Sequence, residues 1–143
     1  MTRYQIRLMR KSFAALLPVA EAAAALFYAR LLELEPALRA SLASDLREQG
    51  RRLMHTLTVV VRSLDAPDTL EPALRVLGRQ VGYGISHAHE ASTELALLWT
   101  LEQALGNEFT PEVREAWRAA HQLLIAKLHT TPNESHAPRL RAA

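Results

Sequence analysis

Hydrophobic residues recur along the chain every three or four positions, which is the spacing of the buried face of an α-helix. Ile6, Met9 and Phe13 begin this pattern in a first helix that we expect over residues 3–17. Further helices are expected over 18–34, from Pro36 onward for a short one, and over 45–64, 69–80, 87–105 and 110–129. Helical spacing maintained over so much of the chain predicts an all-α fold in which each helix buries one face.

Capping residues stand where several of these helices are expected to start and stop. Ser44 or Asp45 suits the N-terminus of the long helix ending near 64, and Thr110 before a proline suits that of the last helix. Gly106 suits the C-terminus of the helix before it. Residues 130–143 hold two prolines and few apolar groups, so they predict a disordered tail. The sequence therefore predicts one domain over residues 1–129.

Composition narrows the classes of function. Hydrophobic residues form 49% of the 143 positions, as in a packed domain. Seventeen Lys and Arg residues are interspersed with fifteen Asp and Glu, so no basic stripe points to nucleic acid. The absence of cysteine excludes disulfides and thiolate ligands and fits a cytoplasmic protein. A charged N-terminus argues against a signal peptide, and we expect no apolar run of the roughly 18 residues that a membrane span needs.

Four segments carry a resemblance to a known family. They are Leu26-Phe-Tyr-Ala-Arg-Leu-Leu, Glu48-Gln-Gly-Arg-Arg-Leu-Met, Leu98-Trp-Thr-Leu-Glu-Gln-Ala-Leu-Gly and Phe109-Thr-Pro-Glu-Val-Arg-Glu-Ala-Trp. Together they resemble bacterial single-domain haemoglobins and the globin domain of flavohaemoglobins, over residues 3–129. The resemblance implies a globin fold, a three-over-three helical sandwich, around a haem that binds oxygen or nitric oxide.

The resemblance assigns Tyr28 and Gln49 to the distal side of the haem, where such a pair hydrogen-bonds the gas ligand. A hydroxyl and an amide are suitable donors to a ligand with partial negative charge. Leu53 lies one turn after Gln49 and is expected on the same face. Leu42 stands where these globins usually place a phenylalanine against the haem. The alternative interpretation makes Tyr28 and Gln49 partners in a helical core.

The proximal side departs from the family. Residues 77–84 read Leu-Gly-Arg-Gln-Val-Gly-Tyr-Gly, one residue shorter than the related pattern that contains the iron-ligating histidine. Counting forward through Leu77 places Val81 at the ligand position, whereas counting back from Tyr83 places Gln80 there. Neither valine nor a neutral amide is a usual iron ligand in globins. These four residues are expected beside the haem, but the segment predicts that ordinary haem ligation is impaired.

Two histidines are candidates for a replacement iron ligand. His121 shares a helical face with Trp117 and is expected to point inward, and His89 stands at the start of the helix over 87–105. The alternative is structural: a hydrogen-bonded pair of Glu90 and His121 would fill space that tyrosines occupy in similar proteins.

Three interpretations of the function remain open. The first is a haem protein that binds oxygen, nitric oxide or carbon monoxide as a carrier, scavenger or sensor. The second is a haem-free globin fold acting as an interaction or sensing module, and the third is a decayed copy without a selected role. No catalytic constellation and no electron-supplying domain is recognised, so the sequence predicts no enzyme on its own. A homodimer that uses apolar residues near 81–85 also stays open.

Overall fold

A computed structural model of the chain describes residues 1–40, 45–66, 72 and 89–130. The α-helices are α1 (Arg3–Leu16), α2 (Ala20–Leu34), α3 (Leu46–Arg62), α5 (Glu90–Leu105) and α6 (Pro111–Thr130), with 3₁₀ turns at Leu17–Val19, Pro36–Ala40 and Gly106–Glu108. Five expected helices and the short element from Pro36 are thereby confirmed. The helix expected over 69–80 and the tail expected over 130–143 fall outside the described residues, apart from positions 72 and 130.

Local chemistry sets the helix boundaries. Thr2 and Gln5 form a reciprocal capping box at α1, with both bonds at 3.0 Å. Asp45, one of the two expected caps, accepts a hydrogen bond from the backbone N–H three residues later at 3.1 Å, and Thr110 does the same for α6 at 3.2 Å. Pro18 lies in the turn between α1 and α2, so α2 begins two residues later than expected. Proline has no N–H to continue the hydrogen bonds of α1.

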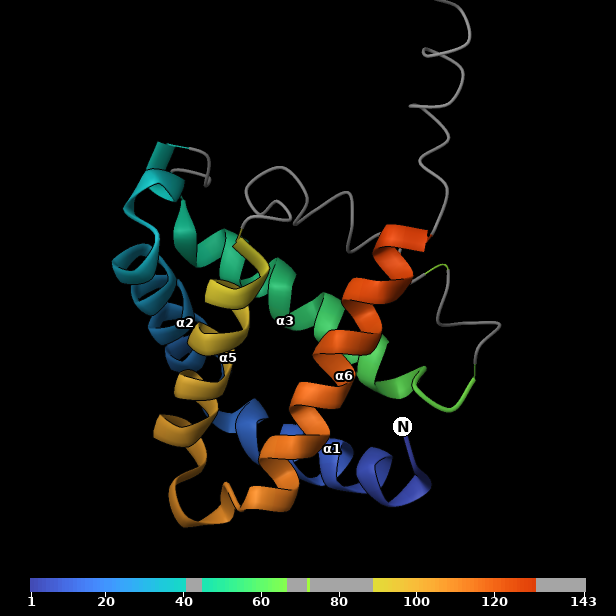
Figure 1. Cartoon of the computed structure of the whole chain (residues 1–143). Helices are drawn as coiled ribbons and strands as arrows, with labels where there is room; N and C mark the ends of the chain where they lie inside the picture. The colour runs from blue at the N-terminus through green and yellow to red at the C-terminus, as the bar shows by residue number, and fades with distance from the viewer. Residues whose placement is uncertain (41–44, 67–71, 73–88, 131–143) are drawn as a thin grey trace, which may run out of the picture.

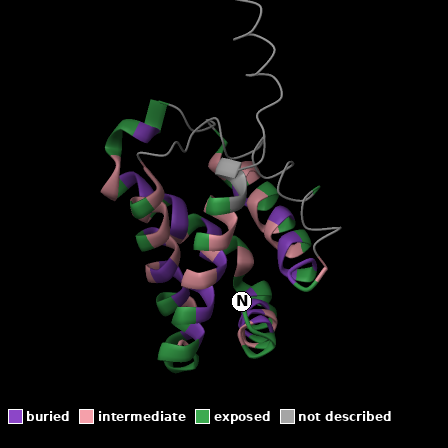
Figure 2. Cartoon of the chain, turned by 45° about the vertical axis from the view of Figure 1, so that its right-hand side comes forward, coloured by how far each residue is buried: buried purple, intermediate pink, exposed green. Residues whose placement is uncertain are grey.

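The helices enclose their apolar faces by crossing one another. In Figure 1, α2 and α5 run side by side, α3 crosses behind α5 and α6, and α1 lies beneath α6. α2 packs against both α5 and α3, whereas α6 packs mainly against α1. Figure 2 shows the buried residues on the sides of the helices that face one another and the exposed residues on the outer sides.

The larger apolar cluster is built mainly from α1, α3, α5 and α6, and Ala23 of α2 joins it. Trp117 stands within it at 2% exposure, and its indole Nε1 donates a 2.9 Å hydrogen bond to Oγ of Ser12. The Ser12 hydroxyl donates in turn to the carbonyl of Leu8 at 2.7 Å, so the buried polar atoms are satisfied. The buried members of this cluster are Ile6, Met9, Phe13, Leu16, Ala23, Val60, Val61, Leu64, Leu98, Leu101, Leu105, Val113, Ala116, Trp117 and Ala120.

A second apolar cluster lies between α2, the Pro36–Ala40 turn and α5. Its buried members are Phe27, Tyr28, Leu31, Leu32, Leu38 and Ala96. The half-buried side chains of Leu34, Leu46, Leu53 and Leu97 pack against it. Leu97 also packs against the larger cluster, so α5 joins the two.

The crossing of α2 and α3 depends on a glycine. A Cβ atom built on Gly50 would lie 2.9 Å from the Cβ of Ala24, closer than the non-bonded contacts that Cβ atoms show in proteins. Both positions are in helices, so the methyl of Ala24 cannot rotate away. The absence of a side chain at Gly50 therefore sets how closely α2 and α3 approach.

The expectation that no apolar run is long enough to span a membrane is wrong by length and composition. The stretch Arg3–Leu34 contains an 18-residue window with a mean hydropathy of 1.6, of which 39% is buried in the fold. The stretch crosses the turn between α1 and α2, and both helices contribute buried residues to the core. A core helix and an N-terminal signal sequence pass the same test, so this window is weak evidence for a membrane span.

The helix crossing gives a first prediction. Gly50→Ala should lower the free energy of unfolding by about 1–3 kcal/mol, because the new methyl overpacks the crossing and outweighs alanine's better helix propensity. Adding Ala24→Gly to this variant should recover part of the loss by removing the opposing methyl. Urea unfolding of the two single variants and the double variant forms a double-mutant cycle. Additive free-energy changes would contradict the proposed steric contact.

Candidate functional site

Tyr28 and Gln49, the two residues assigned to one polar pair, meet at the contact of α2 and α3. Tyr28 is 3% exposed and belongs to the second apolar cluster. Its side chain is hydrogen-bonded to the side chain of Gln49. Burial raises the pKa of the Tyr28 hydroxyl to about 12, and the bond to Gln49 opposes this rise to a lesser extent. The hydroxyl is therefore neutral, and able to donate, at any physiological pH.

The face of α3 that carries Gln49 is only partly covered. Gln49 and Leu53 are one helical turn apart and point to the same side. The residues of this face that are half-buried are Leu46, Gln49, Leu53 and Leu57, whereas Val60 and Leu64 further along are buried. Leu46 and Leu53 pack against the second cluster. The N-terminal half of α3 thus presents a mainly apolar face with one amide, that of Gln49, which meets the buried hydroxyl of Tyr28 on α2.

Five of the expected haem-side residues lie outside the described part of the chain. They are Leu42, Leu77, Gln80, Val81 and Tyr83. The loop expected at 81–85 lies there as well. The structure therefore shows the positions of the expected distal residues, Tyr28, Gln49 and Leu53, but it does not describe the proximal segment.

His121 points inward from α6, as expected, but its partner differs from the one expected. Its side chain is 11% exposed, and Nδ1 lies 3.2 Å from Oε1 of Glu94 on α5. The predicted partner was Glu90, one helical turn earlier. α5 and α6 meet at the later turn, so it is Glu94 that reaches the imidazole. The guanidinium of Arg118 lies 3.7 Å from the other oxygen of Glu94.

His89 stands at the N-cap position of α5, near the C-terminus of α2. Its Nε2 lies 3.8 Å from Oε2 of Glu35, whose other oxygen accepts a 2.8 Å hydrogen bond from Ser92. Sequence reasoning missed both acids that face the histidines. For Glu94 a signal was available in the sequence: it lies four residues after Glu90, so both carboxylates lie on one face of α5.

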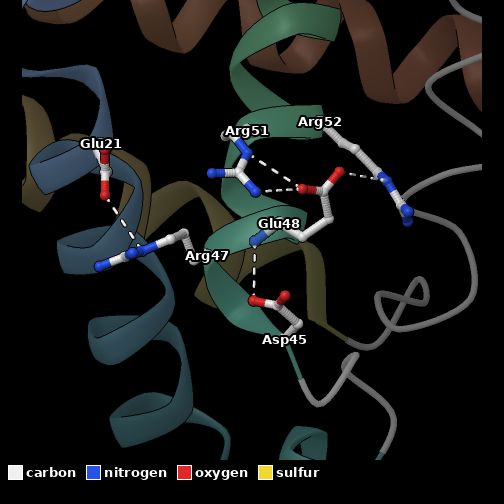
Figure 3. A network of polar contacts seen from close by, with 6 residues as sticks. All are labelled: Glu21, Asp45, Arg47, Glu48, Arg51 and Arg52. Atoms are coloured by element: carbon white, nitrogen blue, oxygen red, sulfur yellow. Dashed lines mark hydrogen bonds and ion pairs between the residues drawn. The ribbon is translucent and has the colours of Figure 1, made fainter.

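A surface groove between α2 and α3 has a volume of about 1110 Å³. Tyr28 lines it, but Gln49 and Leu53 do not, so it is not the space predicted for a haem. Charged residues along α3 pair locally, as Figure 3 shows: Arg47 reaches Glu21 of α2 at 3.3 Å, and Glu48 binds both Arg51 and Arg52. Exposed pairs of this kind contribute little to stability.

The described residues contain no group of three or more His, Asp or Glu side chains that could hold a bare metal ion.

Comparison with known proteins defines the class. The globin family matches residues 13–128, so this chain belongs to the globin family. It is 33% identical to a flavohemoprotein of Xylella fastidiosa over 99 residues, which are 66% of this chain and 24% of that protein. It is 26% identical to the anaerobic nitrite reductase HBII of Casuarina glauca over 151 residues, covering 92% of this chain and 94% of that one.

A solved structure agrees with this assignment. An engineered carbene transferase, made from a putative nitric oxide dioxygenase of Rhodothermus marinus, matches with a TM-score of 0.82 at 26% identity. The match covers 100% of this chain and 99% of that one. The expected all-α globin fold and the resemblance to bacterial haemoglobins are confirmed, and the chain belongs to the haem-based gas-binding lineage of globins. It spans only a quarter of the flavohemoprotein.

The buried tyrosine gives a second prediction. In the unfolded chain the Tyr28 hydroxyl has the ordinary pKa of 10.0, whereas in the folded protein its pKa is about 12. The neutral hydroxyl therefore contributes its full share to the free energy of unfolding below pH 10. This contribution, about 2–3 kcal/mol, is lost as the pH rises to 12. Urea unfolding across this range should show a steeper loss for the wild type than for Tyr28→Phe. Parallel pH dependences for the two proteins would contradict the assignment.

Proposed function

We propose that this protein is a haem-binding globin that holds a diatomic gas against the Tyr28–Gln49 pair. The observation that carries the proposal is the hydrogen bond between these side chains, in an otherwise apolar setting beside a half-covered face of α3. Leu46, Leu53 and Leu57 are apolar and half-buried, and they would form the wall against which a flat apolar group packs. When bound, haem supplies an iron with an open position for a small ligand.

The polar pair would select among gases. Tyr28 stays protonated because burial raises its pKa to about 12, so it offers an O–H rather than a charge. Gln49 adds two N–H donors on a helix that keeps the amide beside the hydroxyl. Donors fixed in a low-dielectric setting favour a ligand that gains negative charge, such as oxygen, over a less polar one, such as carbon monoxide.

The anchoring side of the haem is proposed to be unusual. The segment Leu77 to Gly84 contains no histidine, so the usual ligand is missing from the stretch that resembles the family's proximal site. Haem affinity would then depend on the apolar walls and on a ligand from elsewhere. The named relatives, a flavohemoprotein and a nitrite reductase, support gas chemistry as the setting. On its own this chain is proposed to bind gas rather than to turn it over.

Adding haemin to the purified protein tests the proposal. Binding should produce a Soret absorption band and raise the melting temperature, because a ligand at 100 times its dissociation constant adds about 2.7 kcal/mol of stability. A colourless protein with an unchanged melting temperature would contradict haem binding. That outcome would favour the haem-free interaction or sensing module.

The distal pair gives a third prediction. In the reduced haem-loaded protein, Tyr28→Phe and Gln49→Leu should each raise the oxygen dissociation rate about ten- to hundredfold, because each removes a hydrogen bond to a polar ligand worth about 1.5–3 kcal/mol. Carbon monoxide dissociation should change much less. His55→Gln is the matched control, since His55 is exposed on the same helix. Equal effects on both gases would argue against a hydrogen-bonding role.

A further inference from the structure

Helix α1 carries positive charge without the carboxylates that accompany it elsewhere in the chain. Residues 1–20 contain four of the 17 Lys and Arg residues and none of the 15 Asp and Glu residues. One of the four, Arg10, is paired with Asp65, which follows α3, at 2.8 Å. The other three are Arg3, Arg7 and Lys11. Charges that are interspersed over the chain as a whole are therefore separated in this helix.

Arg3, Arg7 and Lys11 form one row along the exposed side of α1. They are spaced four residues apart, so each lies about one helical turn after the last, and all three are exposed. In the part of the chain that the structure describes, no carboxylate pairs with any of them. The exposed arginines in the first turns of α3, by contrast, pair with Glu21 and Glu48. In Figure 1, α1 lies along the lower right edge of the molecule, so its row of cations faces solvent.

Exposed apolar side chains accompany this row. Tyr4 is 51% exposed, and its ring centroid lies 5.9 Å from the guanidinium carbon of Arg7. Leu17 and Val19 are exposed in the turn that ends α1. Of the six large hydrophobic residues that are exposed in the described ranges, four lie in residues 1–19, the fourth being Met1. Cations without carboxylates, combined with exposed apolar side chains, are typical of a helix that lies on a lipid surface.

The opposite side of α1 is committed to the fold. Ile6, Met9, Phe13 and Leu16 are buried in the larger apolar cluster, where α1 packs against α6, α3 and α5. An isolated amphipathic helix inserts its apolar face into the boundary between headgroups and acyl chains. In this protein that face stays in the core, so contact with a bilayer is made by the charged side and its few apolar neighbours. Such contact is shallow and reversible and leaves the fold intact.

We propose that the outer side of α1, with Arg3, Arg7 and Lys11, docks this protein on a bilayer surface that contains anionic lipids. The negative potential of such a surface attracts each cation, and the exposed side chains of Tyr4 and Leu17 enter the headgroup region. A nucleic acid also presents phosphates, but its charged backbone offers no burial to apolar side chains such as these. Three cations give weak binding that salt screens. Docking of this kind is independent of the proposed haem site.

Sedimentation of the purified whole chain with lipid vesicles tests the proposal. The protein should bind vesicles of equal parts phosphatidylglycerol and phosphatidylcholine, and not pure phosphatidylcholine, and added sodium chloride should release it. Arg3→Gln, Arg7→Gln and Lys11→Gln should each weaken binding about fivefold, and the triple variant roughly a hundredfold. Leu17→Ser should weaken binding without changing its salt dependence, because it removes apolar contact and no charge.

A second triple variant, Arg47→Gln with Arg51→Gln and Arg52→Gln, is the matched control. It removes the same formal charge from exposed residues, but from α3, where these arginines pair with carboxylates. It should keep most of the vesicle binding. Circular dichroism checks that both triple variants are folded; should the α1 triple variant unfold, the three single variants carry the same comparison.

The outcomes distinguish lipid docking from other uses of α1. Failure of the wild type to bind the anionic vesicles, or an equal loss of binding in the two triple variants, would overturn the proposal. Binding of the wild type to a DNA duplex of arbitrary sequence, without binding to the vesicles, would make α1 a nucleic-acid surface instead. Haemin binding is measured separately, so the proposed gas-binding function can stand when lipid docking fails, and the reverse.

Discussion

The close approach of α2 and α3 at Gly50 and Ala24 is the contact on which the site depends. Gly50 directly follows Gln49 on α3, and Ala24 is one helical turn before Tyr28 on α2. A crossing set by two small residues therefore brings the amide and the hydroxyl into hydrogen-bonding range. A larger side chain at either position would move the two helices apart, and the polar pair would separate with them. The same helix crossing therefore determines both the packing of α3 on α2 and the position of the polar pair.

The setting of the pair explains why it is useful. Tyr28 lies among Phe27, Leu31 and Leu32 of the second cluster, and this burial keeps its hydroxyl protonated. An unpartnered buried hydroxyl would be costly, and Gln49 satisfies it. A gas ligand that accepts from both groups would replace a hydrogen bond within the protein by bonds to the ligand. A polar ligand gains binding free energy from these hydrogen bonds that an apolar ligand does not gain, and this difference is the physical basis of the proposed selectivity.

Much of this arrangement could be predicted from the sequence because it follows from local rules. Helical periodicity, the Asp45 cap and the Thr110 cap gave five helices with boundaries within a few residues, and the spacing of Gln49 and Leu53 gave one face. The pairing of His121 could not be predicted reliably. Glu90 and Glu94 lie on one face of α5, and which of them meets α6 depends on how the helices cross. The segment around Gln80 and Val81 lies outside the described residues, and counting through it from either side gives a different register, so neither periodicity nor resemblance fixes its chemistry.

Two histidine–carboxylate pairs flank the start of α5. Glu35 and Glu94 each face an imidazole from a different helix, and so α5 is tied to α2 on one side and to α6 on the other. Both pairs can act as structural ties between helices.

The infrared absorption of carbon monoxide added to the reduced, haemin-loaded protein tests the central claim most directly, because its stretching frequency reports hydrogen bonding at the ligand. The account predicts a carbon monoxide band that moves to higher frequency when Tyr28 is replaced by phenylalanine. The absence of any bound carbon monoxide band, or a band at the same frequency in both proteins, would contradict it.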